Sequence, residues 1–190
     1  MDLVPIPSQT AGPFFHLGLT TTRSVLWIAE SDAAGERVSL TCRLLDGDGN
    51  PVNDAMIEIW QADANGKYNH PDDTQEKSLD PAWFGFGRAG TAEDGSCKFE
   101  TIKPGRVAGP GNALQAPHLT LAIFARGMLK QLYTRVYFAG DAANSDDPIL
   151  ALVPLPRRET LLAQPDEAGS ARWKFDIHLQ GDQETVFFDV

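Results

Sequence analysis

Two side chains that could bind a metal ion lie beside segments with strong turn or strand character. Tyr68 follows the Asn65-Gly66 turn, and His118 precedes the apolar run from 119 to 125. A phenol and an imidazole are both common metal ligands. Each also commonly packs in a core with one hydrogen bond, and for this pair taken alone the packing interpretation is favoured.

The other histidines and the two cysteines add little to this chemistry. His16 and His70 fall in long irregular stretches, whereas His178 belongs to an alternating C-terminal segment on which solvent exposure is expected. Cys42 and Cys97 lie far apart in the sequence, and two thiols in a chain of this size do not make a disulfide framework. We expect both cysteines to be reduced, buried and apolar in character.

Short alternating runs separated by clusters of Gly, Pro, Asn and Asp are the dominant pattern of the chain. Val38, Leu40 and Cys42 share one face of an extended segment, with polar residues between them, as in a half-buried strand. The runs 119–125 and 129–138 are separated by Arg126-Gly127, which predicts a central hairpin. Strands are expected at 38–44, 56–60, 97–102, 119–125, 129–138, 173–179 and 186–190.

This spacing of strands and turns favours an all-β fold with a β-sandwich core, a long N-terminal arm, long loops and few short helices. The best helical candidates are 149–153 and 158–163, and Pro154 and Pro156 limit how far either can extend. The arm, residues 1–37, and the region 67–88 are long for structureless connections. We expect both to pack on a neighbour or to line a site.

The length and charge of the chain narrow the classes of partner. A chain of 190 residues with 42% hydrophobic content is expected to form a single domain, residues 1–190. A formal net charge of −10 opposes binding to nucleic acid or to an anionic membrane. The sequence has neither a basic and apolar leader pattern nor a run long enough for a membrane span, so a cytoplasmic location is expected.

Three motifs, in order and spacing, resemble the intradiol ring-cleaving dioxygenases. They are Trp60-Gln61-Ala62 with the turn leading to Tyr68, then Lys103-Pro104-Gly105, then the strand that starts at His118. In iron-bearing members of that family, the first motif supplies one tyrosinate, a tyrosine shortly after the second supplies another, and an H-x-H strand supplies two imidazoles. The resemblance covers most of the chain.

This sequence keeps only half of the ligand set that the resemblance implies. Tyr68 matches the first tyrosine and His118 the first histidine, whereas Val107 and Thr120 stand where the other two ligands are expected. Ferric iron is a hard cation that favours phenolate oxygen, and valine has no donor atom while a threonine hydroxyl is a poor neutral ligand. We therefore expect no metal in this chain, and Tyr68, Val107, His118 and Thr120 are read as vestigial ligand positions.

The pattern also resembles the iron-free alpha chains that pair with an iron-bearing beta chain in this family. The segments 7–14, 121–127 and 180–189 carry this part of the resemblance. It implies a hetero-oligomer of alpha–beta protomers with Fe(III) in the beta subunit and the arm, residues 1–37, packed on the partner chain. The assembly would cleave protocatechuate with O2 to 3-carboxy-cis,cis-muconate, and this chain would be active only in that complex.

The same resemblance implies substrate-binding residues but no catalytic residue in this chain. Arg126 would lie near a carboxylated substrate, since its planar fork of donors suits an anion. Phe14 stands where a tyrosine is expected, so its ring can wall a pocket without offering a phenolic oxygen. Without the resemblance, the arm would be read as a surface segment and Arg126 as a solvated charge. The implied set is Thr10, Gly12, Pro13, Phe14 and Arg126.

Two alternatives remain open at this point. The chain could be a non-enzymatic β-sandwich module that binds an aromatic acid, although a monomeric carrier has no need of a long arm rich in Pro and Gly. It could also be a self-sufficient dioxygenase with an unusual ligand set, which the missing donors disfavour. Arg135, Arg157 and Arg158 have no predicted role.

Overall fold

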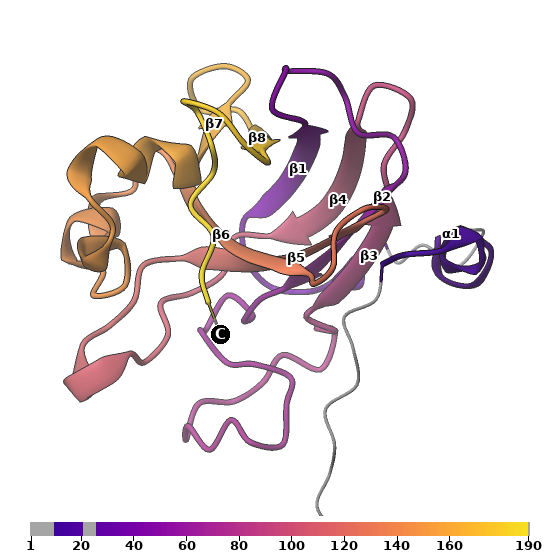
Figure 1. Cartoon of the computed structure of the whole chain (residues 1–190). Coiled ribbons are helices and arrows are strands. Elements are labelled where there is room, and N and C mark those ends of the chain that lie inside the picture. Colours follow the sequence, from indigo (N-terminus) through magenta and orange to yellow (C-terminus); the bar gives the residue numbers. More distant parts are fainter. Residues whose placement is uncertain (1–9, 21–25, 190) are drawn as a thin grey trace, which may run out of the picture.

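Eight strands form one continuous sheet in the computed structural model, which describes residues 10–20 and 26–189. The strands are β1 (Arg37–Leu45), β2 (Ala55–Trp60), β3 (Phe86–Gly90), β4 (Ser96–Ile102), β5 (His118–Ala125), β6 (Leu132–Phe138), β7 (Leu162–Pro165) and β8 (Arg172–His178). Their order in the sheet is β3-β2-β5-β6-β7-β8-β1-β4 (Figure 1). Residues 1–9 and 21–25 of the predicted arm and residue 190 of the last predicted strand lie outside the described residues.

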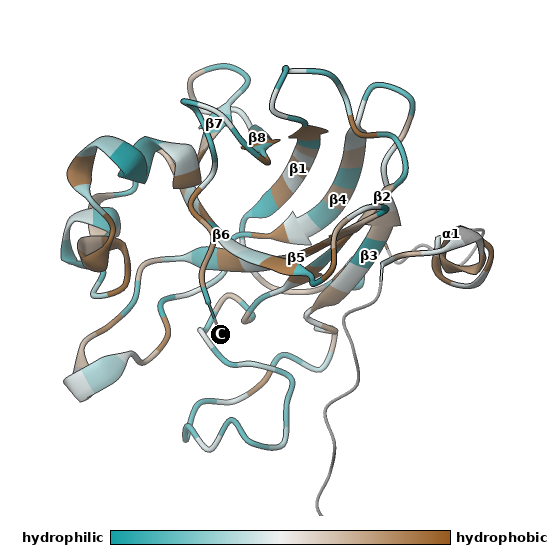
Figure 2. Ribbon diagram, in the orientation of Figure 1, coloured by the Kyte–Doolittle hydropathy of each residue, from teal (hydrophilic) through white to brown (hydrophobic). Residues whose placement is uncertain are grey.

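The sheet folds over on itself so that its two halves enclose one core. Strands β3, β2, β5 and β6 make one half, β8, β1 and β4 make the other, and β7 joins them. The edge strands β3 and β4 also contact each other, so the sheet is nearly closed. Figure 2 shows the hydrophobic residues concentrated along the strands of both halves. The predicted all-β sandwich is confirmed.

The burial pattern of β1 follows the predicted alternation. Val38, Leu40, Cys42 and Leu44 are buried, and their neighbours along the strand are partly or fully exposed up to Arg43. Cys42 lies directly opposite Cys97 in the antiparallel β1–β4 ladder, and both are buried, as predicted. Two sequence segments far apart are thus brought together by strand pairing.

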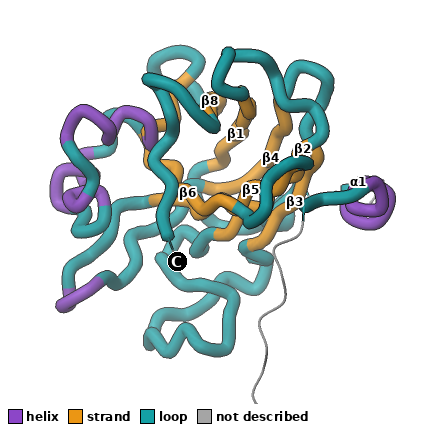
Figure 3. The backbone as a smooth tube through the Cα atoms, viewed as in Figure 1, coloured by secondary structure: helices purple, strands orange, loops and turns teal. Residues whose placement is uncertain are grey.

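Helical segments are short and lie outside the sheet, with α1 on the opposite side from the others, as Figure 3 shows. The single α-helix among the described residues, α1 (Pro13–Leu19), lies within the predicted arm, so the arm is not wholly irregular there. The 3-10 segments are η1 (Pro110–Asn112), η2 (Ala142–Asp146), η3 (Leu150–Leu152) and η4 (Leu155–Leu161). Among the described residues, no helix is long and apolar enough to cross a membrane.

Two strands went unpredicted because backbone pairing, not side-chain pattern, forms them. β3 begins at Phe86, inside the region predicted to be irregular, and its Gly-rich sequence lacks apolar alternation, yet it completes the edge beside β2. β7 begins at Leu162, where a helix was expected, because the chain there joins the two halves of the sheet through β6 and β8.

Other boundaries also differ from the prediction. The second hairpin strand starts at Leu132 and not at 129, because Gly127 adopts a positive φ of 88° and a longer turn follows. The predicted strand 186–190 is only an isolated bridge between Tyr133 and Phe188. The two helical candidates exist as 3-10 segments, with the side chains of Arg157 and Arg158 bonded to backbone carbonyls.

Candidate functional site

The four positions predicted to be vestigial ligand positions lie around two cavities at one end of the β2–β5–β6 sheet. Tyr68 and Val107 line a cavity of about 330 Å³ together with Trp60. Thr120, which pairs with Trp60 across the β2–β5 ladder, lines a second cavity of about 700 Å³. His118, two residues before Thr120, is buried behind them. The fold therefore brings the four positions into one region, as the motif order implied.

Tyr68 is held as a neutral phenol against the wall of the smaller cavity. Its ring stacks on Trp60 with the centroids 6.1 Å apart and the planes 7° from parallel. Burial raises the pKa of Tyr68, and the positive charge of Arg135 offsets only part of that rise. The side chain therefore has no tendency to ionise by itself, in keeping with a packing role.

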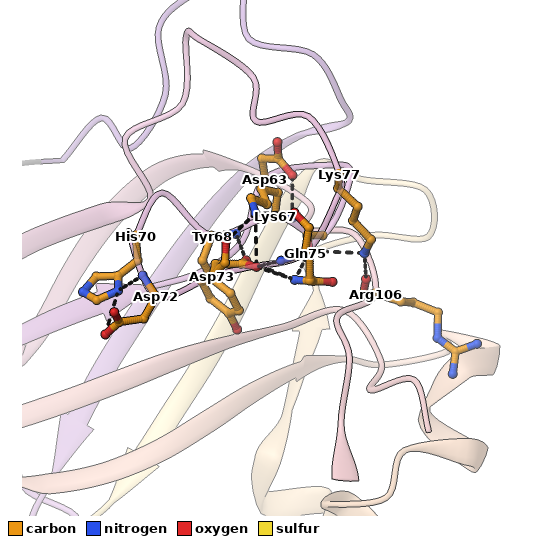
Figure 4. Close-up of polar contacts among 10 residues, drawn as sticks. Asp63, Lys67, Tyr68, His70, Asp72, Asp73, Gln75, Lys77 and Arg106 are labelled. Atoms are coloured by element: carbon orange, nitrogen blue, oxygen red, sulfur yellow. Dashed lines mark hydrogen bonds and ion pairs between the residues drawn. The ribbon is translucent and has the colours of Figure 1, made fainter. Parts of the chain in front are cut away.

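A hydrogen-bonded loop between β2 and β3 positions Tyr68 (Figure 4). The carboxylate of Asp73 accepts hydrogen bonds from the backbone N–H of Tyr68 at 2.8 Å and from the side chains of Lys67 and Gln75. Burial alone would raise the pKa of Asp73, but these bonds together lower it to about 2. Nearer the strand, the buried Asp63 accepts from the backbone N–H of Lys67 at 2.8 Å. The long loop between β2 and β3 has no regular secondary structure here, but these hydrogen bonds hold it in one conformation.

His118 is a neutral imidazole with one ring nitrogen already used. It is only 4% exposed, and its Nδ1 lies 2.8 Å from the carbonyl oxygen of Ala116. Since a carbonyl only accepts, Nδ1 carries the proton. Burial, aided by the charge of Arg135, lowers the pKa of His118 to about 4. The ring also packs against Tyr137 with centroids 5.7 Å apart.

Arg135, which had no predicted role, lies at the centre of this region. It pairs with Thr120 in the β5–β6 ladder and lines the larger cavity. Its Nη1 donates to Gln115 Oε1 at 2.6 Å and to Tyr137 Oη at 3.4 Å. The hydroxyl of Tyr137 in turn lies 3.2 Å from the buried carboxylate of Asp147. The sequence signal for Arg135 was its place on the hairpin strand that faces Thr120.

The residues predicted to bind substrate lie at the other end of β5. The hydroxyl of Thr10 accepts a hydrogen bond from the backbone N–H of Gly127 at 2.7 Å, which ties the arm to the β5–β6 turn. Arg126 is 78% exposed and pairs with Asp54 at 2.9 Å. Phe14 is 82% exposed, in α1.

Gly12 and Pro13 complete that predicted set. The carbonyl of Gly12 accepts a hydrogen bond from the N–H of Phe15 at 3.0 Å, and Pro13 opens α1. The ring of Phe15 packs on Phe124 of β5 at 6.0 Å between centroids, which anchors the helix on the sheet. Seven residue steps along β5 separate His118 from Ala125, a distance of roughly 23 Å, so the arm region and the vestigial positions are two distinct places.

Comparison with known proteins assigns this arrangement to a family. A family model described as "Dioxygenase" matches residues 10–181. The chain is similar to the protocatechuate 3,4-dioxygenase alpha chain of Pseudomonas putida, at 42% identity over 100% of this chain and 98% of that one.

The chain belongs to the intradiol dioxygenase family. It is also similar to the protocatechuate 3,4-dioxygenase beta chain of Burkholderia cepacia, at 34% identity over 83% of this chain and 70% of that one. Among solved structures, the dioxygenase domain of a carbohydrate-binding fusion from Streptomyces sp. SirexAA-E matches with a TM-score of 0.62 and 25% identity, covering 94% of this chain and 99% of that domain.

Intradiol dioxygenases depend on iron, and the residues of this member do not fit the ion. Val107 offers no donor atom, and Thr120 offers only a neutral hydroxyl. Arg135 adds a permanent positive charge beside the retained tyrosine and histidine, which opposes a trivalent cation. A site with only one tyrosine and one histidine as donors, and with an arginine beside them, is poorly suited to ferric iron.

Proposed function

We propose that this chain is the iron-free alpha subunit of a protocatechuate 3,4-dioxygenase and that it works in a complex with an iron-bearing beta chain. The observation that carries the proposal is the replacement of two donors, at Val107 and Thr120, in an otherwise full-length intradiol dioxygenase chain. Similarity to both an alpha chain and a beta chain supports a hetero-oligomer. Fe(III) would be bound by the beta chain, and the complex would be cytoplasmic.

In this complex, the chain would act as one domain whose arm, residues 1–37, packs on the partner. Described residues of the arm support this, because Phe14, Leu17 and Trp27 expose large apolar side chains that a neighbour could cover. Thr10 ties the arm to the β5–β6 turn beside Arg126, which supports a common location for these two predicted binding residues. Together with the rest of the predicted set, they would form one wall of the shared pocket.

The role of this chain in the reaction would be to hold the substrate. The overall reaction inserts both atoms of O2 into protocatechuate and opens the ring between its hydroxylated carbons, giving 3-carboxy-cis,cis-muconate. Arg126 would bind the ring carboxylate through N–H groups that its pair with Asp54 leaves free. Phe14 would shield the pocket from water without offering a hydroxyl.

Purification of the chain alone and together with an H-x-H-bearing homologous chain tests the proposal. We expect ring cleavage and near-stoichiometric iron only in the joint preparation. Cleavage or near-stoichiometric iron in this chain alone would overturn it. A stable monomer that binds protocatechuate but joins no partner would instead favour the aromatic-acid-binding module.

A further inference from the structure

The larger of the two cavities combines an apolar wall with a single cationic group. It has a volume of about 700 Å³, within the range of small-molecule sites. Leu152, Val153 and Phe188 line it with apolar groups, and Tyr133 and Thr120 add hydroxyl-bearing side chains. Arg135 is the basic residue among the described lining residues, and the carboxylate in the lining, Asp189, is 94% exposed and already pairs with Lys130 at 3.1 Å. The cavity is therefore suited to a ligand that is largely apolar and carries one negative charge.

Arg135 has no carboxylate partner among the described residues, unlike two other arginines on the strands of the sheet. Arg88 pairs with Glu58 and Arg43 with Asp176, whereas no described carboxylate lies within ion-pair distance of Arg135. Its two hydrogen bonds to side chains both use Nη1, and both acceptors are neutral. Within the described chain, its Nε and Nη2 groups have no protein acceptor, so most of its fork of donors remains available.

The guanidinium is nevertheless held in one place. Gln115 and Tyr137 accept hydrogen bonds from Nη1, and the centroid of the Phe188 ring lies 5.9 Å from the guanidinium carbon. Because Tyr137 also contacts the buried Asp147, this arrangement is connected to the core. A fixed, half-buried guanidinium without a counter-ion is a common basis for carboxylate recognition.

We propose that this cavity binds a small organic monocarboxylate with an apolar body, such as an arene carboxylate. The carboxylate accepts hydrogen bonds from Nε and Nη2 of Arg135, and the apolar body packs on Phe188 and Leu152. One negative charge matches one guanidinium, whereas a phosphate dianion would require more cationic groups than the lining holds. The site is separate from Arg126 and does not depend on the proposed function.

Benzoate binding to the full chain, measured by calorimetry, tests this inference. We expect Arg135→Gln to weaken benzoate binding at least tenfold. Benzyl alcohol, a neutral ligand of similar shape, should bind wild type and R135Q with similar affinity, because it carries no carboxylate. The matched control is Arg43→Gln, which removes an exposed guanidinium paired with Asp176 on β1 and should leave benzoate binding unchanged.

A second variant keeps the test valid if R135Q fails to fold. Leu152 is 79% exposed, so Leu152→Glu is expected to fold normally while placing a like charge at the cavity wall, and it should also weaken benzoate binding. Unchanged affinity in both R135Q and L152E would overturn the inference. Loss of affinity in Arg126→Gln with no loss in R135Q would also overturn it, and would place the carboxylate at Arg126, the residue assigned under the proposed function.

Discussion

Thr120 and Arg135 face each other across the β5–β6 ladder, so a permanent cation lies directly beside a position where the sequence predicts a lost metal ligand. The retained Tyr68 and His118 both experience the charge of Arg135, which helps to keep the imidazole neutral. The predicted absence of metal binding in this chain therefore has two causes, the missing donors and the added charge. The two causes can be separated by mutation.

Restoring the donors alone should not restore iron binding. In the double variant Val107→Tyr and Thr120→His, all four donor types are present, but Arg135 still repels the ion. Adding Arg135→Gln should raise ferric iron affinity by about tenfold or more. Metal analysis after dialysis and the visible ferric-tyrosinate absorption measure this. Equal iron content in the double and triple variants would show that the charge of Arg135 has no effect.

The loop that positions Tyr68 should depend on the charge of Asp73. Asp73→Asn should lower the free energy of unfolding at pH 7 by about 1–2 kcal/mol, because Asp73 accepts several hydrogen bonds in its ionised form. The folded-state pKa of about 2 lies below the unfolded value, so this stabilisation is present above about pH 4 and is lost as the pH falls towards 2.

Urea unfolding of both proteins between pH 2.5 and pH 7 measures that loss. The control is Asp72→Asn, which changes a neighbouring carboxylate that is 93% exposed and should leave stability nearly unchanged. A difference between wild type and D73N that stays constant over this pH range would contradict the assignment of the effect to the ionised carboxylate.

Arg126 should discriminate between carboxylated and uncarboxylated substrates of the complex. Arg126→Gln is expected to raise KM for protocatechuate about tenfold, because the variant loses one charge-assisted hydrogen bond to the substrate carboxylate. KM for catechol, which has no carboxylate, should change little. Steady-state kinetics on the assembled complex provide the test. Arg43→Gln is the matched control, since Arg43 is an exposed, paired arginine on β1. Parallel loss for both substrates would point to a structural effect.

Phe14 should contribute to assembly and not to the stability of the chain. Because its ring is 82% exposed, Phe14→Ala should leave the melting temperature of the isolated chain unchanged. If the arm packs on the partner, the same variant should weaken association by about 1–3 kcal/mol, as for a buried aromatic contact. Sedimentation of mixtures gives the affinity. Leu155→Ala, also exposed but in η4, is the control and should have no effect on association.

The sequence by itself determined the fold class and predicted that two iron ligands are missing. Alternation such as Val38, Leu40 and Cys42 is a local property of a half-buried strand, so it predicts β1 without knowledge of partners. The missing donors at Val107 and Thr120 are a matter of covalent chemistry. Motif order was sufficient to place both positions.

Tertiary structure decided what surrounds those positions. β3 and β7 form because neighbouring strands offer backbone partners, which leaves no side-chain pattern to find. Arg135 meets Thr120 only because of the hairpin register, and its lack of a carboxylate depends on which side chains the fold brings near it. The residue type alone fixes which donor atoms a side chain has. The charge and the space around those atoms depend on neighbouring residues, which strand pairing and packing bring close.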